Sequence, residues 1–260
     1  MKSKNKSLFV ASLKLATKNP NKVGLMILFD IMFFVSFFGL RTLFSYFAKS
    51  LVVEKTLLFG LIFLVFTLIY YLIVLFVYSL FKYSILYFIK SFFERAEISF
   101  KSLGQFYSLN IIIAGIFFAI FLIFGFILEN IKQAYQPFVF ISLAVPYSLF
   151  LYVILNTSHS LFYEGASTKE SIKKSFKITF TKIKVYRETI LVMILFAVLL
   201  GILFKGAGYL INLIAPKNYF NVYYYFKLVS IVVFDIVFYF IILINRISFY
   251  QMVKNFNASH

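Results

Sequence analysis

The chain has 260 residues, a formal net charge of +17, 62% hydrophobic residues and 13% charged residues, and it contains neither cysteine nor tryptophan. Soluble domains usually hold about 45–50% apolar and about 25% charged residues, so this composition excludes an ordinary soluble protein and indicates a helical membrane protein. Without cysteine, the chain has no disulfide framework, no thiolate metal site and no thiolate nucleophile.

Six apolar runs are long enough to cross about 30 Å of hydrocarbon as α-helices, which rise about 1.5 Å per residue. The first run is too long for the core of a signal peptide, and no small-residue cleavage site follows it, so we expect an uncleaved anchor. The predicted fold class is all-α: a polytopic membrane protein with six transmembrane helices. The predicted spans are 23–48, 57–81, 109–128, 138–156, 189–211 and 226–250.

A basic, amphipathic stretch precedes the first, third and fifth of these spans. Each stretch carries a Ser-Leu/Phe-Lys tripeptide: Ser12-Leu13-Lys14, Ser99-Phe100-Lys101 and Ser175-Phe176-Lys177. This recurrence predicts a single membrane domain, 1–260, with three internal repeats at 7–81, 91–156 and 167–250, each a surface helix followed by a helical hairpin. The alternative is chance recurrence in a chain rich in these residues, combined with the lysine bias of cytoplasmic loops.

The three stretches have the spacing of helices that lie in the membrane interface, with apolar residues on one face and charged residues on the other. Asn19-Pro20 is expected to end the first helix, and Ser167-Thr168-Lys169-Glu170 has the form of a capping box at the start of the third. The predicted apolar faces are Phe9, Leu13 and Ala16; Phe92, Ala96, Phe100, Leu103 and Tyr107; and Ile172, Phe176, Phe180 and Ile183.

Lysine and arginine gather before the first span, after the second and after the fourth, on one side of the predicted membrane. Cytoplasmic loops carry such an excess, so both termini are expected in the cytoplasm. Lysine and arginine side chains this close to the spans can bind anionic lipid head groups, and each contributes about 1 kcal/mol of attraction to such a membrane surface. We therefore attribute the net positive charge to membrane topology and lipid binding rather than to nucleic-acid binding. Protein partners at the same face, or a homo-oligomer, are alternatives. The candidate lipid contacts are Lys14, Lys101, Lys173, Lys174, Lys177, Lys182 and Lys184.

Ionisable residues inside the spans are candidates for function, because each costs roughly 2.5–3.5 kcal/mol near the bilayer centre. We predict that Asp30 pairs with Asn245 or Arg246 and that Asp235 pairs with Arg41, one pair in each leaflet, which would hold the first span against the last. The alternatives are carboxylates that line a proton or cation path, and a role in binding lipid head groups.

Other polar or helix-breaking residues in the spans are expected to be structural. Pro146 should kink the fourth span, with a gating hinge as the alternative. Asn110, Asn156 and His159 fall near cytoplasmic span ends, where water or backbone can satisfy them, and His159 is expected at the interface. The small-residue spacing Gly115/Ala119, which recurs in the fifth span, allows close helix packing or a homodimer face.

The stretch Leu13-Lys14-Leu15-Ala16-Thr17-Lys18-Asn19-Pro20 leads into the first span, and Ser171-Ile172-Lys173-Lys174-Ser175-Phe176-Lys177 leads toward the fifth. With these stretches, the chain resembles uncharacterised prokaryotic six-helix membrane proteins, which are similar to the membrane domain that accompanies some bacterial glycerophosphodiesterases. The resemblance implies a multi-pass protein of a prokaryotic plasma membrane. It brings no catalytic residue, because the phosphodiesterase chemistry of those proteins belongs to a separate soluble domain.

Enzymatic functions have little support in the sequence. His159 and His260 are the only histidines, and no hydrolase, zinc-protease or phosphate-loop motif occurs. We therefore expect a protein that is not an enzyme and that holds no cofactor or metal. The predicted function is a membrane-complex subunit or a lipid-interacting scaffold with a basic cytoplasmic face. The alternative is a small-solute or ion transporter or channel that uses Asp30 and Asp235.

Overall fold

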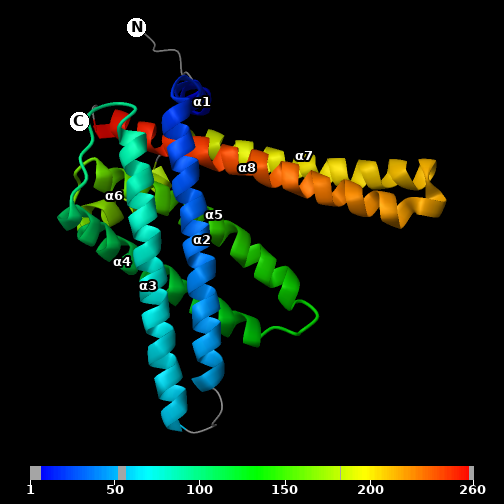
Figure 1. The fold of residues 1–260 in the computed structure, drawn as a ribbon, viewed down its shortest axis with the longest axis horizontal. Coiled ribbons are helices and arrows are strands. Elements are labelled where there is room, and N and C mark those ends of the chain that lie inside the picture. Colours follow the sequence, from blue (N-terminus) through cyan, green and yellow to red (C-terminus); the bar gives the residue numbers. More distant parts are fainter. Residues whose placement is uncertain (1–6, 52–56, 182, 258–260) are drawn as a thin grey trace. The chain divides into compact units, whose positions relative to one another are not determined.

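A computed structural model describes residues 7–51, 57–181 and 183–257 of the chain. Over these residues the chain is helical with no strand, which confirms the all-α class (Figure 1). The short 3₁₀-helix η1 spans Pro216–Asn218. The α-helices are α1 (Leu8–Lys18), α2 (Pro20–Leu51), α3 (Leu57–Lys90), α4 (Phe100–Glu129), α5 (Gln136–Tyr163), α6 (Thr168–Thr181), α7 (Ile183–Ile214) and α8 (Tyr219–Asn257).

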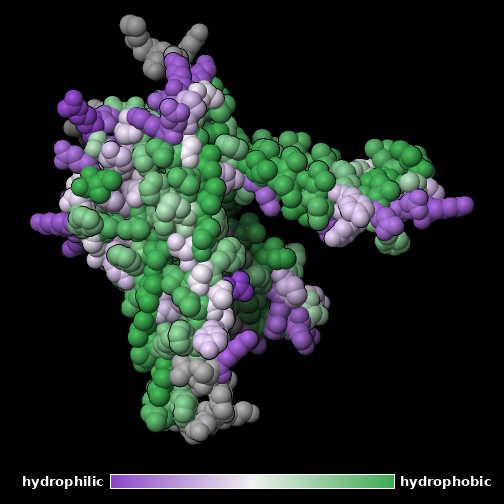
Figure 2. Space-filling view, in the orientation of Figure 1, coloured by the Kyte–Doolittle hydropathy of each residue, from purple (hydrophilic) through white to green (hydrophobic). Residues whose placement is uncertain are grey.

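Six of these helices, α2, α3, α4, α5, α7 and α8, are long and apolar enough to cross a membrane. Each contains one of the predicted spans, so the chain is an integral membrane protein. Large apolar side chains cover their outer surfaces, including Val35 (67% exposed), Leu64 (61%) and Phe126 (67%). Figure 2 shows this hydrophobic surface along the long helices. Such exposure suits hydrocarbon, because an apolar face of this extent in water would be an aggregation site.

The chain forms two compact units. The contiguous unit is Lys18–Phe180 and holds α2 to α6. The discontinuous unit combines the chain before Lys18 with the chain from Thr181 onward, so it holds α1 together with α7, η1 and α8.

In the contiguous unit, α2 lies along α3, and α4 contacts both α3 and α5 (Figure 1). The α2–α3 contact is aromatic over much of its length: the ring of Phe44 stacks on Tyr70 at 4.2 Å and on Phe66 at 5.1 Å between centroids. The most deeply buried side chains gather at one end, where α3 and α5 finish and α4 begins. They include Ile85, Ile89, Phe106, Leu109, Ile113, Ile154 and Leu161.

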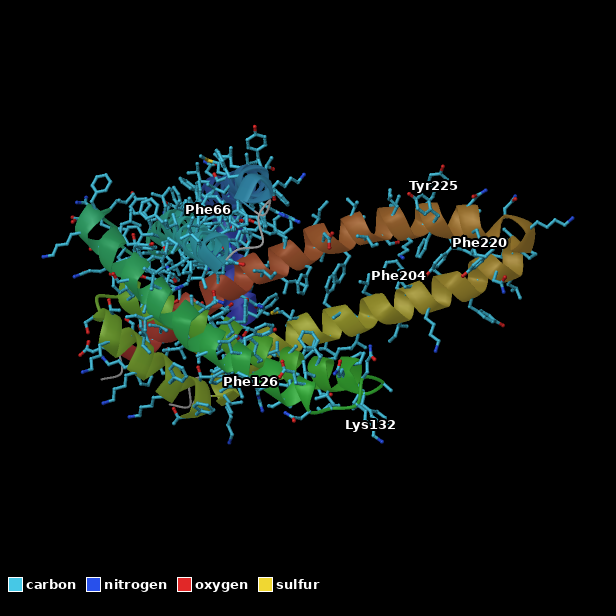
Figure 3. The ribbon with its side chains drawn as sticks, turned by 90° about the horizontal axis from the view of Figure 1, so that it is seen from below. Phe66, Phe126, Lys132, Phe204, Phe220 and Tyr225 are labelled. Atoms are coloured by element: carbon cyan, nitrogen blue, oxygen red, sulfur yellow. The ribbon has the colours of Figure 1, made fainter. Side chains whose placement is uncertain are left out.

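In the discontinuous unit, α7 and α8 lie side by side. Figure 3 shows Phe204 between these two helices and Tyr225 pointing away from them. Phe196 and Phe234 stack across the contact with 5.0 Å between centroids. The two helices come close together at Gly208, where an added Cβ would lie 3.2 Å from Cε2 of Tyr223. The close packing expected at Gly115 does not occur in the described structure, because an added Cβ there meets nothing within 4 Å.

Two serine side chains tie α1 to the rest of the discontinuous unit. Ser7 Oγ donates to Glu188 Oε1 on α7, and Ser12 Oγ donates to Gln251 Oε1 on α8 at 3.1 Å. Ser12, the serine of the first tripeptide, is fully buried, so it serves packing as well as hydrogen bonding. As predicted, Asn19-Pro20 separates two helices, because Pro20 is the first residue of α2.

One predicted surface helix is partly wrong. Residues 91–94 form a turn and a bend, 95–99 are irregular, and α4 begins only at Phe100. The chain reverses direction between α3 and α4, and a hydrogen bond from Lys22 Nζ to the Ser91 carbonyl (2.5 Å) holds the turn. In the third stretch, α6 forms, and Ser167 Oγ accepts the Glu170 N–H at 3.4 Å, which is one half of the predicted capping box.

Candidate functional site

The predicted intramembrane residues lie on two helices from different units. Asp30 (6% exposed) and Arg41 (exposed) are on α2, whereas Asp235 (exposed), Asn245 (buried) and Arg246 are on α8. Asn245 Nδ2 donates to the Thr189 carbonyl on α7 at 3.1 Å. Because each predicted pair joins a residue of one unit to a residue of the other, both pairs stay predictions.

The predicted lipid contacts are exposed lysines. Lys14 lies on α1, Lys101 in the first turn of α4, Lys173, Lys174 and Lys177 on α6, and Lys184 in the first turn of α7. Lys182 lies outside the described residues. Large apolar side chains stand exposed beside these lysines: Leu13 (39%), Phe100 (90%), Phe180 (64%) and Ile183 (53%).

A buried chain of hydrogen bonds links α3, α4 and α5 at the deeply buried end of the contiguous unit. We call Ser79, Asn110 and His159 the polar relay. His159 Nε2 and Asn110 Oδ1 are 2.7 Å apart, and Asn110 Nδ2 donates to Ser79 Oγ at 2.9 Å. Ser79 Oγ donates in turn to the Leu75 carbonyl at 2.6 Å. His159 and Ser79 are fully buried, and Asn110 is 2% exposed.

The direction of each hydrogen bond in the relay follows from the bond that Ser79 donates. Ser79 uses its single proton on the Leu75 carbonyl, so its oxygen must accept from the Asn110 amide. The Asn110 carbonyl oxygen is then turned to His159, and an oxygen can only accept. His159 therefore carries a proton on Nε2. Since each helix gives one polar group, the relay fixes the register of α3, α4 and α5 against one another.

Aromatic rings cover the relay. Phe106 lies with its ring centroid 4.8 Å from that of His159 and 5.5 Å from that of Phe162. The Tyr83 ring is 5.7 Å from Phe106 and 5.0 Å from Tyr163. Three of these residues, Tyr83, Phe162 and Tyr163, also line a cleft.

The relay corrects one expectation from sequence. His159 is not an interfacial residue in contact with water; it is buried among rings and bonded to another helix. Asn156, which was expected to use water or backbone, does donate to the Tyr152 carbonyl of its own helix at 2.8 Å. The available signal was the presence of polar residues in the three apolar runs, but sequence spacing alone does not say which of them meet.

The cleft lies where α3 and α5 end and where α4 and α6 begin. It has a volume of about 500 Å³. Its charged lining residues are Lys90, Arg95 and Glu97, and its remaining lining residues are Tyr83, Ser102, Gln105, Phe162, Tyr163, Gly165, Ala166 and Ser167. We call it the end cleft.

Lys90 is fixed at the edge of the end cleft by three contacts. Its ammonium donates to the Tyr163 carbonyl at 3.2 Å, lies 3.4 Å from the Glu94 carboxylate and stands 5.8 Å from the centre of the Tyr163 ring. An ammonium has three donors, so this arrangement leaves capacity for another acceptor.

Arg95 and Glu97 lie two residues apart on the irregular segment before α4. Both side chains are exposed and both line the end cleft. In the part of the chain that the structure describes, neither makes a hydrogen bond or an ion pair. The cleft thus presents one guanidinium and one carboxylate that no neighbouring side chain neutralises.

Among the described residues there is no group of three or more His, Asp or Glu side chains that could hold a metal ion. No protein-family model, curated protein or solved structure matches this chain.

Proposed function

We propose that this integral membrane protein is a non-catalytic scaffold or complex subunit whose basic cytoplasmic face binds anionic lipids and partner proteins. In this proposal the six long helices cross the membrane as three hairpins, with α1 and α6 at the cytoplasmic interface. The resemblance to membrane domains that accompany glycerophosphodiesterases belongs to the same proposal, since such a domain supplies membrane attachment and no catalytic group.

The observation that carries the proposal is the pairing of exposed lysines with exposed apolar residues on α1, α6 and the first turns of α4 and α7. On α6, Lys173, Lys174 and Lys177 are exposed, and Phe180 exposes 64% of its surface. A helix of this kind buries its apolar side chains among acyl chains while its ammonium groups reach the phosphates. Phe176 and Phe180 also contact the Phe150 ring of α5, with centroids 5.9 and 5.3 Å apart, so α6 is held on the bundle.

The orientation can be tested directly because the chain has no native cysteine. Single-cysteine variants Lys174→Cys and Lys132→Cys would be labelled in intact cells with a membrane-impermeant maleimide. Lys132 follows α4, on the predicted outer side. We expect labelling of Lys132→Cys only, and labelling of Lys174→Cys after the cells are opened. Labelling of Lys174→Cys in intact cells would overturn the orientation.

Lipid binding can be tested by native mass spectrometry of the purified protein with phosphatidylglycerol. A triple variant, Lys173→Gln, Lys174→Gln and Lys177→Gln, removes three α6 charges, and a matched control, Lys132→Gln, Lys205→Gln and Lys217→Gln, removes three from the predicted outer side. At about 1 kcal/mol per lysine, the first variant should lose much of its phosphatidylglycerol and the control little. Equal losses would argue against a lipid-binding cytoplasmic face.

The buried carboxylate of Asp30 supports the transporter or channel as a second candidate, because ionisable groups inside a membrane bundle often line ion paths. Proteoliposomes loaded with a pH- or cation-sensitive dye distinguish the two. A scaffold leaves permeability at the level of empty liposomes. A flux that Asp30→Asn or Asp235→Asn abolishes, without loss of folded protein, would replace the scaffold by the transporter.

A further inference from the structure

We propose that the end cleft binds the head group of a zwitterionic phospholipid, with its phosphate at Arg95 and Lys90 and its primary ammonium at Glu97. The chemistry is that of phosphoethanolamine esterified to a glycerolipid. The inference rests on the proposed function, because it requires this end of the helices to lie at the level of the head groups, but it names a site and a ligand class that the exposed lysines do not define.

The charges of the end cleft are the first argument. Lys90 already has a carboxylate partner in Glu94, whereas Arg95 and Glu97 have none among the described residues. A ligand with one negative and one positive group matches this pair, while a purely anionic head group would leave Glu97 facing a like charge. The guanidinium fork can bond two phosphate oxygens at once, and the carboxylate can accept from an ammonium.

The position of the end cleft is the second argument. Its lining includes the last residues of two apolar helices, Lys90 of α3 and Tyr163 of α5, and Ser102 in the first turn of α4. Ends of membrane-spanning helices lie where phosphates lie, so a head group reaches the cleft without crossing hydrocarbon. The inner wall is aromatic, with Tyr83 4% exposed and Phe162 and Tyr163 each 8% exposed, and tyrosines of this kind favour the boundary between head groups and acyl chains.

The size and the polar lining are the third argument. A volume of about 500 Å³ lies in the range of small-molecule pockets, roughly 300–1,000 Å³, and leaves room for a phosphate together with its ethanolamine and glycerol. Ser102, Gln105 and Ser167 add uncharged donors and acceptors to the wall. Ser167 uses its oxygen as an acceptor for the Glu170 N–H and can still donate its proton.

The arrangement predicts a selectivity among lipids. Phosphatidylglycerol has no ammonium, so it leaves the Glu97 carboxylate without a partner. Phosphatidylcholine has a quaternary ammonium with no N–H to donate to that carboxylate. A primary ammonium supplies what both lack, and one hydrogen bond to a charged group is worth about 1.5–3 kcal/mol. We therefore expect phosphatidylethanolamine to bind about ten times or more tightly than phosphatidylcholine at this site.

Native mass spectrometry of the delipidated full-length protein, with the three lipids added singly, tests the site. Wild type should hold one phosphatidylethanolamine molecule in preference to phosphatidylcholine. Arg95→Gln should reduce its occupancy about tenfold, and Glu97→Gln should remove the preference over phosphatidylglycerol. Arg95 and Glu97 are exposed and have no side-chain partner among the described residues, so the fold should survive both substitutions. Lys132→Gln and Glu129→Gln, exposed residues outside the cleft, serve as charge-matched controls and should keep the preference.

The outcomes separate this proposal from the broader one. Loss of phosphatidylglycerol on removing the α6 lysines, with no lipid preference at the end cleft, would sustain the scaffold and overturn the head-group site. Equal binding of all three lipids, or no effect of Arg95→Gln, would overturn it too. A final competition experiment adds soluble O-phosphoethanolamine to the lipid-bound protein. If it displaces the lipid at equal concentration, the ligand is a soluble phosphoamine and the lipid assignment fails.

Discussion

The hydrogen bond between His159 and Asn110 should be measurable as a coupling energy between two helices. The perturbation is His159→Phe on α5, combined with Asn110→Leu on α4, because both replacements keep the approximate shape of the side chain. His159→Phe leaves the Asn110 oxygen, in a residue only 2% exposed, without the donor that now lies 2.7 Å away. An unsatisfied buried acceptor costs about 1–3 kcal/mol in the free energy of unfolding.

The double variant should lose less than the sum of the single variants. Asn110→Leu breaks the bond to His159 and the bond from Asn110 to Ser79, but Ser79 keeps its own bond to the Leu75 carbonyl. In the double variant the loss of the His159–Asn110 bond contributes once to the change in the free energy of unfolding. The Asn110 oxygen is also gone, so it is not left buried without a donor. The coupling energy should therefore be about 1 kcal/mol, which lies between the mean of about 0.6 kcal/mol and the maximum of about 1.7 kcal/mol measured for such bonds between membrane helices.

Unfolding in mixed micelles with increasing sodium dodecyl sulfate, followed by circular dichroism, gives the four free energies. Asn130→Leu is the control partner for His159→Phe, since the Asn130 side chain donates to the Phe126 carbonyl of the helix that it follows and lies about 30 Å along α4 from Asn110. That pair should be additive within about 0.5 kcal/mol. Additivity of the His159–Asn110 pair to the same degree would refute the relay.

Three further changes test other parts of the fold. Gly201→Ala should raise the thermal midpoint of unfolding in detergent, because alanine gains about 1 kcal/mol of helix propensity and its Cβ meets nothing within 4 Å. Gly208→Ala should raise the midpoint less or lower it, since its Cβ would lie 3.2 Å from Tyr223. Equal shifts of the midpoint would contradict the close approach of α7 and α8 at Gly208. Ser12→Ala should lower the free energy of unfolding by about 1 kcal/mol and speed amide hydrogen exchange in α1. The control is Ser84→Ala, which loses a hydrogen bond within α3. Unchanged exchange in α1 would show that the bond to Gln251 does not hold this helix. Asp235→Asn should lower the thermal midpoint, and Asp235→Arg combined with Arg41→Asp should restore it, if the predicted pair forms; absence of rescue would argue for another partner.

The six spans were predictable because their signal is local. Hydropathy over about twenty residues identifies a membrane-length helix without knowledge of its neighbours, and each predicted span lies inside a long helix of the structure. Only the ends differ: α3 continues to Lys90 and α8 to Asn257, since polar residues at the end of a span do not stop a helix. The start of α2 at Pro20 was predictable for the same local reason.

The second surface helix shows where local pattern is insufficient. Phe92, Ala96 and Phe100 have helical spacing, but only Phe100 is in a helix. The connection between α3 and α4 depends on contacts from elsewhere in the chain, such as Lys22 with the Ser91 carbonyl. Arg95 and Glu97 lie in this irregular connection before α4, and there they line a cleft.

The polar relay could not be derived from sequence because it depends on which residues of three separate helices meet. Asn110 and His159 were recognised as polar residues near span ends, yet their burial and their bond arise from packing between α4 and α5. Hydropathy values describe each residue alone. Which residues of two helices meet depends on how each helix is oriented about its own axis. A nearly uniform apolar sequence specifies this orientation weakly.

The discontinuous unit has a consequence for the order in which the protein assembles. Ser12 is synthesised before its hydrogen-bond partner, Gln251, which lies 239 residues later in the chain. At roughly 5–20 residues per second, the ribosome needs on the order of ten seconds or more to synthesise the chain between them. The contiguous unit, Lys18–Phe180, can complete its packing during that interval. Helix α1 therefore cannot form its contacts with α7 and α8 until those helices have been made. A chain truncated after α6 would lack the residues to which Ser7 and Ser12 are hydrogen-bonded.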